Sequence, residues 1–360
     1  MRIVLSGGGT GGHVFPLIAL AAELKRNADK ELSILFIGQK GSLEEKEAKT
    51  LGLKFWPLVR QSNRRGFPGI LISLALAFLG ILQSIYFLLR FSPDVVVGGG
   101  GYVSLPAIAA SVLLRKPFVI LEQNMIPGKI TRLFSRWARM VFLAFPGSEK
   151  HLSGNFKVVG NPIREELLLP KSEARKLLQV PDDAFLIVVA GGSKGARSLN
   201  LHLAGIVPEL IKMFPQLLVF WLTGEAHHQE VLKRIPDNLE RLIAVPFDFR
   251  APQWISAADL YIGRAGAGFL WEVLSSGVPS ILIPYPYAAD GHQIANARFL
   301  ETSGASLMIL EEDRKTLKSK IEELILSPQL LSRMGENARI LGRKSAAQEI
   351  ASYLKETWKK

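Results

Sequence analysis

A strand followed by a glycine-rich turn and a helix opens each half of this sequence. In the first half the expected strand 2–6 runs into residues 7–13 (GGGTGGH), and in the second half the expected strand 185–190 runs into residues 191–196 (GGSKGA). Both strands read as continuous apolar runs, which is typical of parallel strands buried on both faces. The repeated unit predicts an α/β protein with two Rossmann-like domains, each built on a parallel sheet.

The rest of the chain continues the alternation of short apolar runs with helical stretches. Its 360 residues also exceed what one hydrophobic core usually serves. We therefore expect domains at 1–160 and 161–345, followed by a C-terminal helix at 346–360 whose docking site the sequence does not specify. The further expected strands are 33–38, 95–98, 118–122, 141–144, 217–222, 242–245, 259–262 and 280–284.

The positive charge of the chain is concentrated in its first half. Residues 1–160 contain 20 Lys and Arg against 9 Asp and Glu, whereas residues 161–360 contain 24 against 23. A basic surface suits nucleic acid, anionic lipid or a phosphorylated substrate. Nucleic acid is disfavoured because no RNA-binding aromatic signature, zinc-finger spacing or basic low-complexity tail is present.

Two further features bear on compartment and chemistry. Cysteine is absent, which excludes a disulfide framework, a thiolate metal site and a cysteine nucleophile. The amino terminus has four apolar residues before its first glycine, fewer than the roughly 7–15 that a secretory signal needs. We therefore expect the protein to stay in the cytoplasm.

The segment 70–91 is the most apolar part of the chain, and its length alone would suit a transmembrane helix. It connects strands that must pair in one sheet, however, and one crossing would place the glycine turns on opposite faces of the bilayer. Apolar residues surround most of its circumference and arginines precede it, as in helices that lie beside anionic headgroups. We favour such interfacial binding over a core helix or a dimer contact. The residues expected to face the membrane are Arg64, Arg65, Ile70, Leu74, Phe78, Ile81 and Phe87.

A third glycine turn, residues 98–102 (GGGGY), also follows an expected strand. Glycines allow close backbone approach to a ligand, and helix amino termini offer free N–H groups to anions. The first turn formally matches the dinucleotide fingerprint G-x-G-x-x-G, but the second strand ends at Gln39 without the acid that would hold a ribose. Three turns in two domains therefore predict one anionic ligand in the crevice between the domains, with NAD disfavoured.

His13 ends the first glycine turn and is our candidate for a catalytic base. Imidazole can accept a hydroxyl proton near neutral pH, and a helix amino terminus keeps it neutral. The alternative is a histidine that only binds phosphate or caps the helix. No D-x-D metal clamp occurs, so we expect no metal and no cofactor. Loop N–H groups and helix dipoles, with Arg164 or Arg264, would then stabilise a departing diphosphate.

Short motifs form an ordered set along nearly the whole chain. They are residues 8–13 (GGTGGH), 99–104 (GGGYVS), 122–124 (EQN), 160–164 (GNPIR), 191–196 (GGSKGA), 264–267 (RAGA), 290–293 (DGHQ) and 296–297 (NA). This set resembles the MurG family of glycosyltransferases. The resemblance implies the GT-B architecture, in which two Rossmann-like domains face each other across a cleft and the second holds most of the donor.

The resemblance also implies roles for individual residues. It makes His13 and Glu122 catalytic, and it places Gly100, Gly101 and Tyr102 on the acceptor side. A carboxylate at Glu272 would accept from two ribose hydroxyls, and the amide of Gln293 would read the sugar hydroxyls. The other implied donor-binding residues are Thr10, Gly11, Gly12, Asn124, Arg164, Ser193, Ala267 and Gly268.

The implied reaction is an inverting, metal-independent transfer of N-acetylglucosamine from UDP-N-acetylglucosamine. The acceptor would be the muramoyl 4-hydroxyl of undecaprenyl-diphospho-muramoylpentapeptide, in peptidoglycan synthesis. The implied location is peripheral, on an anionic membrane surface at the cytoplasmic face of the inner membrane, with contacts to other cell-wall enzymes.

Two other classes of function stay open at this point. Another GT-B lipid glycosyltransferase, acting for example on diacylglycerol, would share the glycine turns and the apolar helix. A non-catalytic membrane adaptor would keep the basic first half. The sequence also departs from the family pattern at Phe269 and at residues 247–252 (FDFRAP), which leaves the detailed donor contacts open there.

Overall fold

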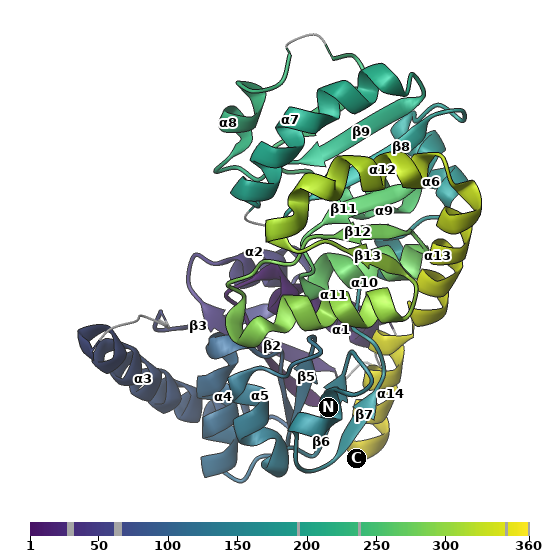
Figure 1. Ribbon diagram of the computed structural model, residues 1–360. Helices are drawn as coiled ribbons and strands as arrows, with labels where there is room; N and C mark the ends of the chain where they lie inside the picture. The colour runs from purple at the N-terminus through teal and green to yellow at the C-terminus, as the bar shows by residue number, and fades with distance from the viewer. Residues whose placement is uncertain (27–31, 61–66, 193–194, 237–238, 343–344, 359–360) are drawn as a thin grey trace. The chain divides into compact units, whose positions relative to one another are not determined.

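The computed structural model describes residues 1–26, 32–60, 67–192, 195–236, 239–342 and 345–358 (Figure 1). The chain divides into two compact units. The first consists of Met1–Arg164 with Lys344–Lys360, and the second consists of Glu165–Arg343. The chain therefore passes from one unit to the other twice.

The first unit is built on a parallel sheet of seven strands in the order β3-β2-β1-β4-β5-β6-β7. The strands are β1 Arg2–Ser6, β2 Ser33–Gln39, β3 Lys54–Leu58, β4 Val95–Gly98, β5 Phe118–Glu122, β6 Met140–Leu143 and β7 Phe156–Val158. Its helices are α1 Gly11–Arg26, α2 Leu43–Thr50, α3 Phe67–Phe91, α4 Gly101–Leu113, α5 Lys129–Phe134 and α14 Ala346–Trp358.

Alternate residues of the interior strands in this sheet pack into two separate cores. Ile3 and Leu5 of β1 pack on one face with α1 and α14, whereas Val4 packs on the other face with α3, α4 and α5. The side-chain period of two along a strand produces this division. It also explains why the strands read as unbroken apolar runs.

The C-terminal helix α14 belongs to the first unit. Its side chains Ile350 and Leu354 are fully buried in the same core as Leu17 and Leu20 of α1. The docking site that the sequence does not specify is therefore the face of the first sheet that α1 also covers.

The second unit is built on a parallel sheet of six strands in the order β10-β9-β8-β11-β12-β13. The strands are β8 Phe185–Ala190, β9 Leu217–Leu222, β10 Leu242–Val245, β11 Leu260–Gly263, β12 Ser280–Leu282 and β13 Ser306–Met308. Its helices are α6 Lys171–Leu178, α7 Arg197–Met213, α8 His228–Leu232, α9 Ala251–Ala257, α10 Ala267–Ser276, α11 His292–Thr302, α12 Leu317–Ile325 and α13 Pro328–Leu341.

Both sheets reverse their strand order beside the first strand of the unit. β1 lies between β2 and β4, and β8 lies between β9 and β11. This order is that of Rossmann folds, in which ligands bind outside the carboxyl ends of the strands at the reversal. The prediction of two Rossmann-like domains with parallel sheets is confirmed, and the glycine turns follow β1, β4 and β8.

Among the described residues, one helix is long and apolar enough to cross a membrane by length and composition. It is Gly69–Phe91, with a mean hydropathy of 2.2 and 11% of its most apolar window buried. Figure 1 shows α3 extending away from the rest of its unit. The strands before and after α3 in the chain, β3 and β4, lie in one sheet.

The two halves of α3 differ in their surroundings. In the second half Leu88 and Phe91 are buried in the core that α4 shares. In the first half Ile70, Leu74 and Phe78 are 51%, 62% and 61% exposed. The second half also has exposed apolar side chains, because Leu82, Tyr86 and Leu89 are 47%, 56% and 61% exposed, so an outer apolar face runs along the whole helix.

Two other residues expected to face the membrane lie differently. Ile81 is half-buried, and the ring of Phe87 lies 5.1 Å from that of Trp56, centroid to centroid, so Phe87 packs toward the sheet. Phe87 therefore lies on the side of the helix that meets β3, and its expected contact with a membrane stays a prediction. Arg64 and Arg65 lie outside the described residues.

Candidate active site

The carboxyl ends of β1, β4 and β5 lie beside one another, because these three strands are consecutive in the parallel sheet. The backbone N–H of Gly99 donates to Ser6 O across 2.8 Å and so joins the turns that follow β1 and β4. Residues 122–124 follow from the end of β5 at the same edge. The sheet order thus brings three of the expected motifs of the first unit together, residues 8–13, 99–104 and 122–124.

His13 lies in the first turn of α1 and is half-buried. Its Nδ1 is 3.1 Å from Gly99 O and 2.9 Å from Gln123 Oε1. The imidazole is therefore held by one group from the turn after β4 and one from the end of β5. Its position at the amino terminus of α1 also places it in the positive field of the helix dipole.

Glycine is required in the turn that faces His13. Gly100 and Gly101 have φ of +77° and +70°, in the left-handed region that side chains disfavour. A Cβ on Gly101 would lie 2.8 Å from His13 Cδ2. Tyr102 is 37% exposed and lies against Gly9, where a Cβ would be 3.0 Å from Tyr102 Cε1.

The carboxylate of Glu122 organises the loop that follows β5. It is 3% exposed and accepts hydrogen bonds from Asn124 N at 3.0 Å, Gly128 N at 2.9 Å and Thr131 Oγ1 at 2.6 Å. Both of its oxygens are engaged with the chain. This geometry suits a residue that shapes the loop around Asn124 better than one that touches a reacting atom.

The other expected residues of the first unit lie around the start of α1. Thr10 is exposed, Gly11 is buried and Gly12 is half-buried. The guanidinium of Arg164 lies over the ring of Phe15, with its Cζ 4.3 Å from the ring centroid. Arg164 therefore sits beside the start of α1.

A buried acid, Glu44, supports this turn and has no role assigned from the sequence. It is 1% exposed and accepts from the backbone N–H of Gln39 at 3.2 Å. A Cβ on Gly8 would lie 2.4 Å from its Oε1. An acid from α2 therefore lies beside the end of β2, where the dinucleotide fingerprint would have one. Because Glu44 is buried under the glycine turn, it cannot bind the hydroxyls of a ribose.

In the second unit the expected donor residues gather at the carboxyl ends of β11 and β12. Ala267 and Gly268 form the first turn of α10, directly after β11, and Glu272 lies one turn further and is 6% exposed. Gln293 is on α11, and its Oε1 accepts from Tyr285 N at 2.9 Å. Ser193 lies outside the described residues.

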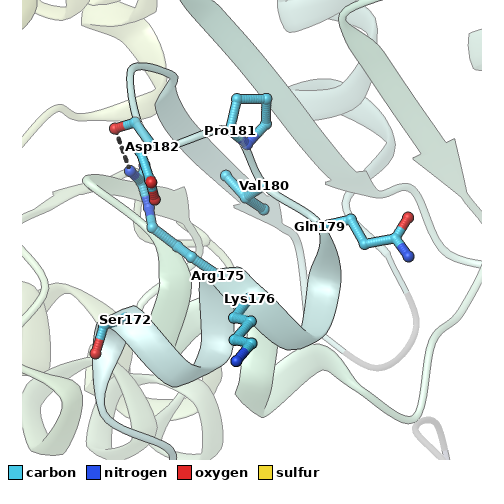
Figure 2. Close-up of a pocket in the computed structure, with 7 residues that line it drawn as sticks. All are labelled: Ser172, Arg175, Lys176, Gln179, Val180, Pro181 and Asp182. Carbon is cyan, nitrogen blue, oxygen red and sulfur yellow. Dashed lines mark hydrogen bonds between the residues drawn. The ribbon is translucent and has the colours of Figure 1, made fainter.

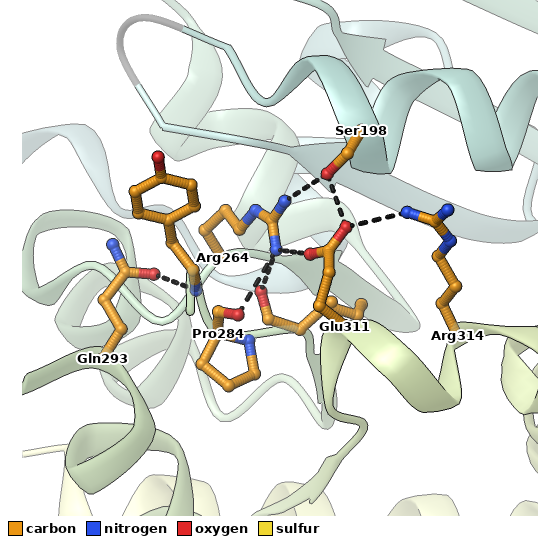
Figure 3. Close-up of polar contacts among 8 residues, drawn as sticks. Ser198, Arg264, Pro284, Gln293, Glu311 and Arg314 are labelled. Carbon is orange, nitrogen blue, oxygen red and sulfur yellow. Dashed lines mark hydrogen bonds and ion pairs between the residues drawn. The ribbon is translucent and has the colours of Figure 1, made fainter. Parts of the chain in front are cut away.

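Arg264 is held by groups of the second unit itself, as Figure 3 shows. It is 6% exposed, forms an ion pair with Glu311, and donates to Ile283 O at 3.0 Å and to Ser198 Oγ at 2.9 Å. Burial acts to raise the pKa of Glu311, but hydrogen bonds from Arg264 and Ser198 outweigh it and lower the pKa below its usual value. The pairing counts against Arg264 as a cation for the diphosphate.

The segment that departs from the family pattern forms an ordered turn before α9. Asp248 accepts from Arg250 N at 2.7 Å and from Trp254 Nε1 at 3.2 Å. The turn leaves the rings of Phe247 and Phe249 exposed, with centroids 4.8 Å apart in an edge-to-face arrangement. Asp248 therefore shapes the turn, and the two aromatic rings form its outer surface.

A surface hollow of about 480 Å³ lies beside α6 (Figure 2). Its Arg175 donates to Asp182 O at 3.1 Å, to Ala184 O at 2.6 Å and to Asp259 Oδ2 at 2.8 Å. Arg175 thus ties α6 to the sheet. The residues that line the hollow are Ser172, Arg175, Lys176, Gln179, Val180, Pro181 and Asp182, and none is an expected site residue.

Sequence comparisons assign both units to one class. Residues 3–143 match the glycosyltransferase family 28 N-terminal domain, and residues 186–350 match the glycosyltransferase family 28 C-terminal domain. Together with the two Rossmann-like units, these matches define a two-domain glycosyltransferase of family 28.

The similar proteins narrow this class. The chain is 38% identical over 365 residues, covering 99% of each chain, to the "UDP-N-acetylglucosamine--N-acetylmuramyl-(pentapeptide) pyrophosphoryl-undecaprenol N-acetylglucosamine transferase" of Thermoanaerobacter sp. (strain X514). It is 35% identical to the protein of that name from Acetivibrio thermocellus, covering 100% of this chain and 99% of the relative. The crystal structure of MurG from Acinetobacter baumannii superposes with a TM-score of 0.77 at 26% identity, covering 99% of both chains. The chain belongs to the MurG family of glycosyltransferases.

The fold extends beyond this family. A UDP-N-acetylglucosamine 2-epimerase from Neisseria meningitidis covers 99% of this chain and 100% of its own, with a TM-score of 0.71 at 14% identity. That likeness concerns the fold alone. The same fold can carry different reactions, so the function has to be argued from the residues of the site.

Proposed function

We propose that this protein transfers N-acetylglucosamine from UDP-N-acetylglucosamine to the muramoyl 4-hydroxyl of undecaprenyl-diphospho-muramoylpentapeptide, with inversion at the anomeric carbon. The observation that carries the proposal is the imidazole of His13, held at the carboxyl ends of β1, β4 and β5 in a chain of this family. The relatives that cover the whole chain at 35–38% identity carry the name of this transferase, which supports the choice of substrates.

The reaction is a single displacement. The acceptor hydroxyl oxygen forms a bond to the anomeric carbon while the bond from that carbon to the diphosphate breaks, and its electron pair leaves with UDP. The hydroxyl proton passes to Nε2 of His13, which acts as general base. Glu122 positions the loop that carries Asn124 and does not itself take the proton, because both of its oxygens accept from the chain.

The second unit binds the donor in this proposal. The amino terminus of α10, at Ala267 and Gly268, offers backbone N–H groups and a positive dipole end to the departing diphosphate. Glu272 accepts from the ribose hydroxyls, and Gln293 uses its amide on the sugar. Arg164 and Ser193 complete the proposed diphosphate and uridine contacts, and Gly100, Gly101 and Tyr102 border the acceptor.

The first half of α3 is the proposed membrane contact, at the cytoplasmic face of the cell membrane. Its exposed side chains Ile70, Leu74 and Phe78 would lie in the interface of an anionic bilayer. Arg136 lies 3.9 Å over the ring of Trp137 just after α5, which covers the same sheet face as α3. A paired cation and aromatic ring suits the headgroup region. Contacts with other cell-wall enzymes stay a prediction.

The direct test follows radioactive label from UDP-N-acetylglucosamine into lipid, with the muramoylpentapeptide lipid and diacylglycerol as alternative acceptors. We expect label only in the muramoylpentapeptide lipid, and label only in diacylglycerol would contradict the proposed acceptor.

His13→Ala should lower kcat by about 10²- to 10⁴-fold, the usual contribution of a general base to the rate, while UDP binding measured by calorimetry is retained. The matched control is His151→Ala, which removes an exposed histidine of the same unit. Unchanged turnover in His13→Ala would remove His13 from the mechanism.

A further inference from the structure

Gln123 is a buried amide that contacts the proposed base directly. It is 1% exposed, and its Oε1 lies 2.9 Å from His13 Nδ1. Its Nε2 donates to Gly99 O and to Leu121 O, both at 3.0 Å. The side chain thus spans from the end of β5 to the turn after β4, and it meets the imidazole there.

The orientation of this amide follows from its neighbours. Both groups beside Nε2 are backbone carbonyl oxygens, which can only accept hydrogen bonds. A flipped amide would place Oε1 against these two acceptors and leave a buried cluster of oxygens without a donor. Burying such unsatisfied polar groups is costly, so Oε1 faces His13 and presents an acceptor to it.

The amide orientation determines which nitrogen of His13 carries the proton. Nδ1 has two neighbours, Gln123 Oε1 and Gly99 O, and both are acceptors. A neutral imidazole satisfies both only if its proton is on Nδ1, which leaves the lone pair on Nε2. The tautomer is therefore the one in which Nε2 can receive a proton.

We infer that Gln123 is the positioning residue of His13: it holds the Nδ1–H tautomer and the ring orientation, so that Nε2 is the atom that takes the acceptor proton. The inference rests on the proposed function for its kinetic part only. An amide accepts from Nδ1–H in both the neutral and the protonated state of the ring, so it can orient the base throughout the reaction without adding a negative charge.

Two further features hold Gln123 in place. The neighbouring Glu122 is tied to the loop 124–131 by four hydrogen bonds from the chain. Gly99 O serves both partners, because it accepts from Gln123 Nε2 and lies beside His13 Nδ1. The imidazole and the amide are thus anchored on one carbonyl oxygen.

The test compares wild-type protein with Gln123→Met, which has a similar volume and no hydrogen-bonding amide. Nitrogen-15 spectra of histidine-labelled protein, assigned with His13→Ala, distinguish a protonated from an unprotonated ring nitrogen. In wild type we expect the proton on Nδ1 of His13, and in Gln123→Met we expect a mixture of tautomers. A wild-type His13 with its proton on Nε2 would overturn the inference, whatever the variant does.

The kinetic arm separates positioning from a structural role. In Gln123→Met we expect kcat to fall about 10- to 100-fold, as for other residues that orient a functional histidine, with the KM values for both substrates nearly unchanged. The matched control is Ser111→Ala, which removes another buried hydrogen bond of the same unit, from Ser111 Oγ to Ala107 O. Unchanged kcat in Gln123→Met, or an equal loss in Ser111→Ala, would overturn the inference.

The two arms also keep this inference distinct from the proposed function. The tautomer is read from the folded protein without substrate, so it stays informative if transfer to the proposed acceptor fails. Failure of all transfer with the expected tautomer present would contradict the substrates and leave the role of Gln123 on His13 standing.

Discussion

Arg264, which is buried, and Glu311, which is partly buried, form an ion pair that connects the end of β11 with the segment after β13. Glu311 also accepts from Ser198 at the start of α7, and Arg314 pairs with the same carboxylate at 3.1 Å (Figure 3). The pair therefore joins three elements of the second unit close to the expected donor residues. Removing one partner leaves the other charge buried without compensation.

Glu311→Gln should accordingly destabilise the second unit. Loss of one partner from a buried pair costs about 3 kcal/mol, and the guanidinium of Arg264 is only 6% exposed. Urea denaturation followed by tryptophan fluorescence measures this loss. The matched control is Glu209→Gln, whose partner Lys318 is on the surface and whose loss should leave the transition nearly unchanged. Equal stability of the two variants would contradict a structural role for the pair.

The stability that Glu311 contributes should depend on pH. Burial raises its pKa, but the hydrogen bonds from Arg264 and Ser198 outweigh this and lower the pKa below the ordinary 4.5. A carboxyl with a lowered pKa stabilises the fold above its unfolded pKa, and the contribution is lost as the pH falls through the folded value. The stability difference between wild type and Glu311→Gln should therefore be constant above pH 4.5 and narrow below it. A difference that widens with acid would contradict this sign.

Gly101→Ala should impair catalysis through His13. The substitution strains a backbone with φ of +70° and places a Cβ 2.8 Å from His13 Cδ2. Displacing a catalytic group by about 1 Å can cost about 100-fold in rate, so we expect a loss of that order in kcat. The matched control is Gly41→Ala, which has nearly the same φ, +69°, and nothing within 4 Å of the new Cβ. It should lose stability but not turnover. A similar kcat in both variants would mean that contact with the imidazole is unimportant.

A charge on the outer apolar face of α3 should weaken membrane binding. Burying an apolar side chain of this size contributes about 1.5–3 kcal/mol, so Phe78→Glu should reduce partitioning onto anionic vesicles at least about tenfold. Co-sedimentation with vesicles measures it, and transfer to a detergent-solubilised acceptor should be unaffected. Leu177→Glu is the control, because Leu177 is 57% exposed on α6 of the second unit. Equal binding of both variants would place the membrane contact elsewhere.

Transfer should proceed in excess EDTA. The sequence has no D-x-D clamp, and the part of the chain that the structure describes holds no group of three or more His, Cys, Asp or Glu that could bind a metal ion. Initial rates with and without the chelator measure the effect, and a metal-dependent glycosyltransferase in the same buffer verifies chelation. Loss of activity that Mg²⁺ or Mn²⁺ restores would contradict a donor site built on backbone N–H groups.

The interior strands and the edge strand β10 could be predicted from the sequence, whereas the other three edge strands could not. β1, β4 and β8 are continuous apolar runs because both of their faces are buried. The strands β3, β7 and β13 lie at sheet edges, are five, three and three residues long, and are only partly buried. An edge strand has hydrogen bonds on one side only and less apolar surface to bury, so its local pattern is weak.

The candidate site shows the same limit for side chains. The glycine turns and His13 could be located because strand, turn and helix follow one another in the sequence. Gln123 and Glu122 are neighbours in one motif, yet one contacts the imidazole and the other holds a loop. That difference depends on which partners surround each buried group, and such partners come from distant parts of the chain. The motif alone therefore does not show which of the two side chains meets the imidazole.

The position of α14 has a consequence for biosynthesis. Ile350 and Leu354 complete a core whose other members come from the first part of the chain. During translation one apolar face of the first sheet therefore stays partly uncovered until the second unit and α14 have been synthesised. A nascent chain halted after Arg164 should bind chaperones that recognise apolar surface, and addition of a synthetic α14 peptide should release them.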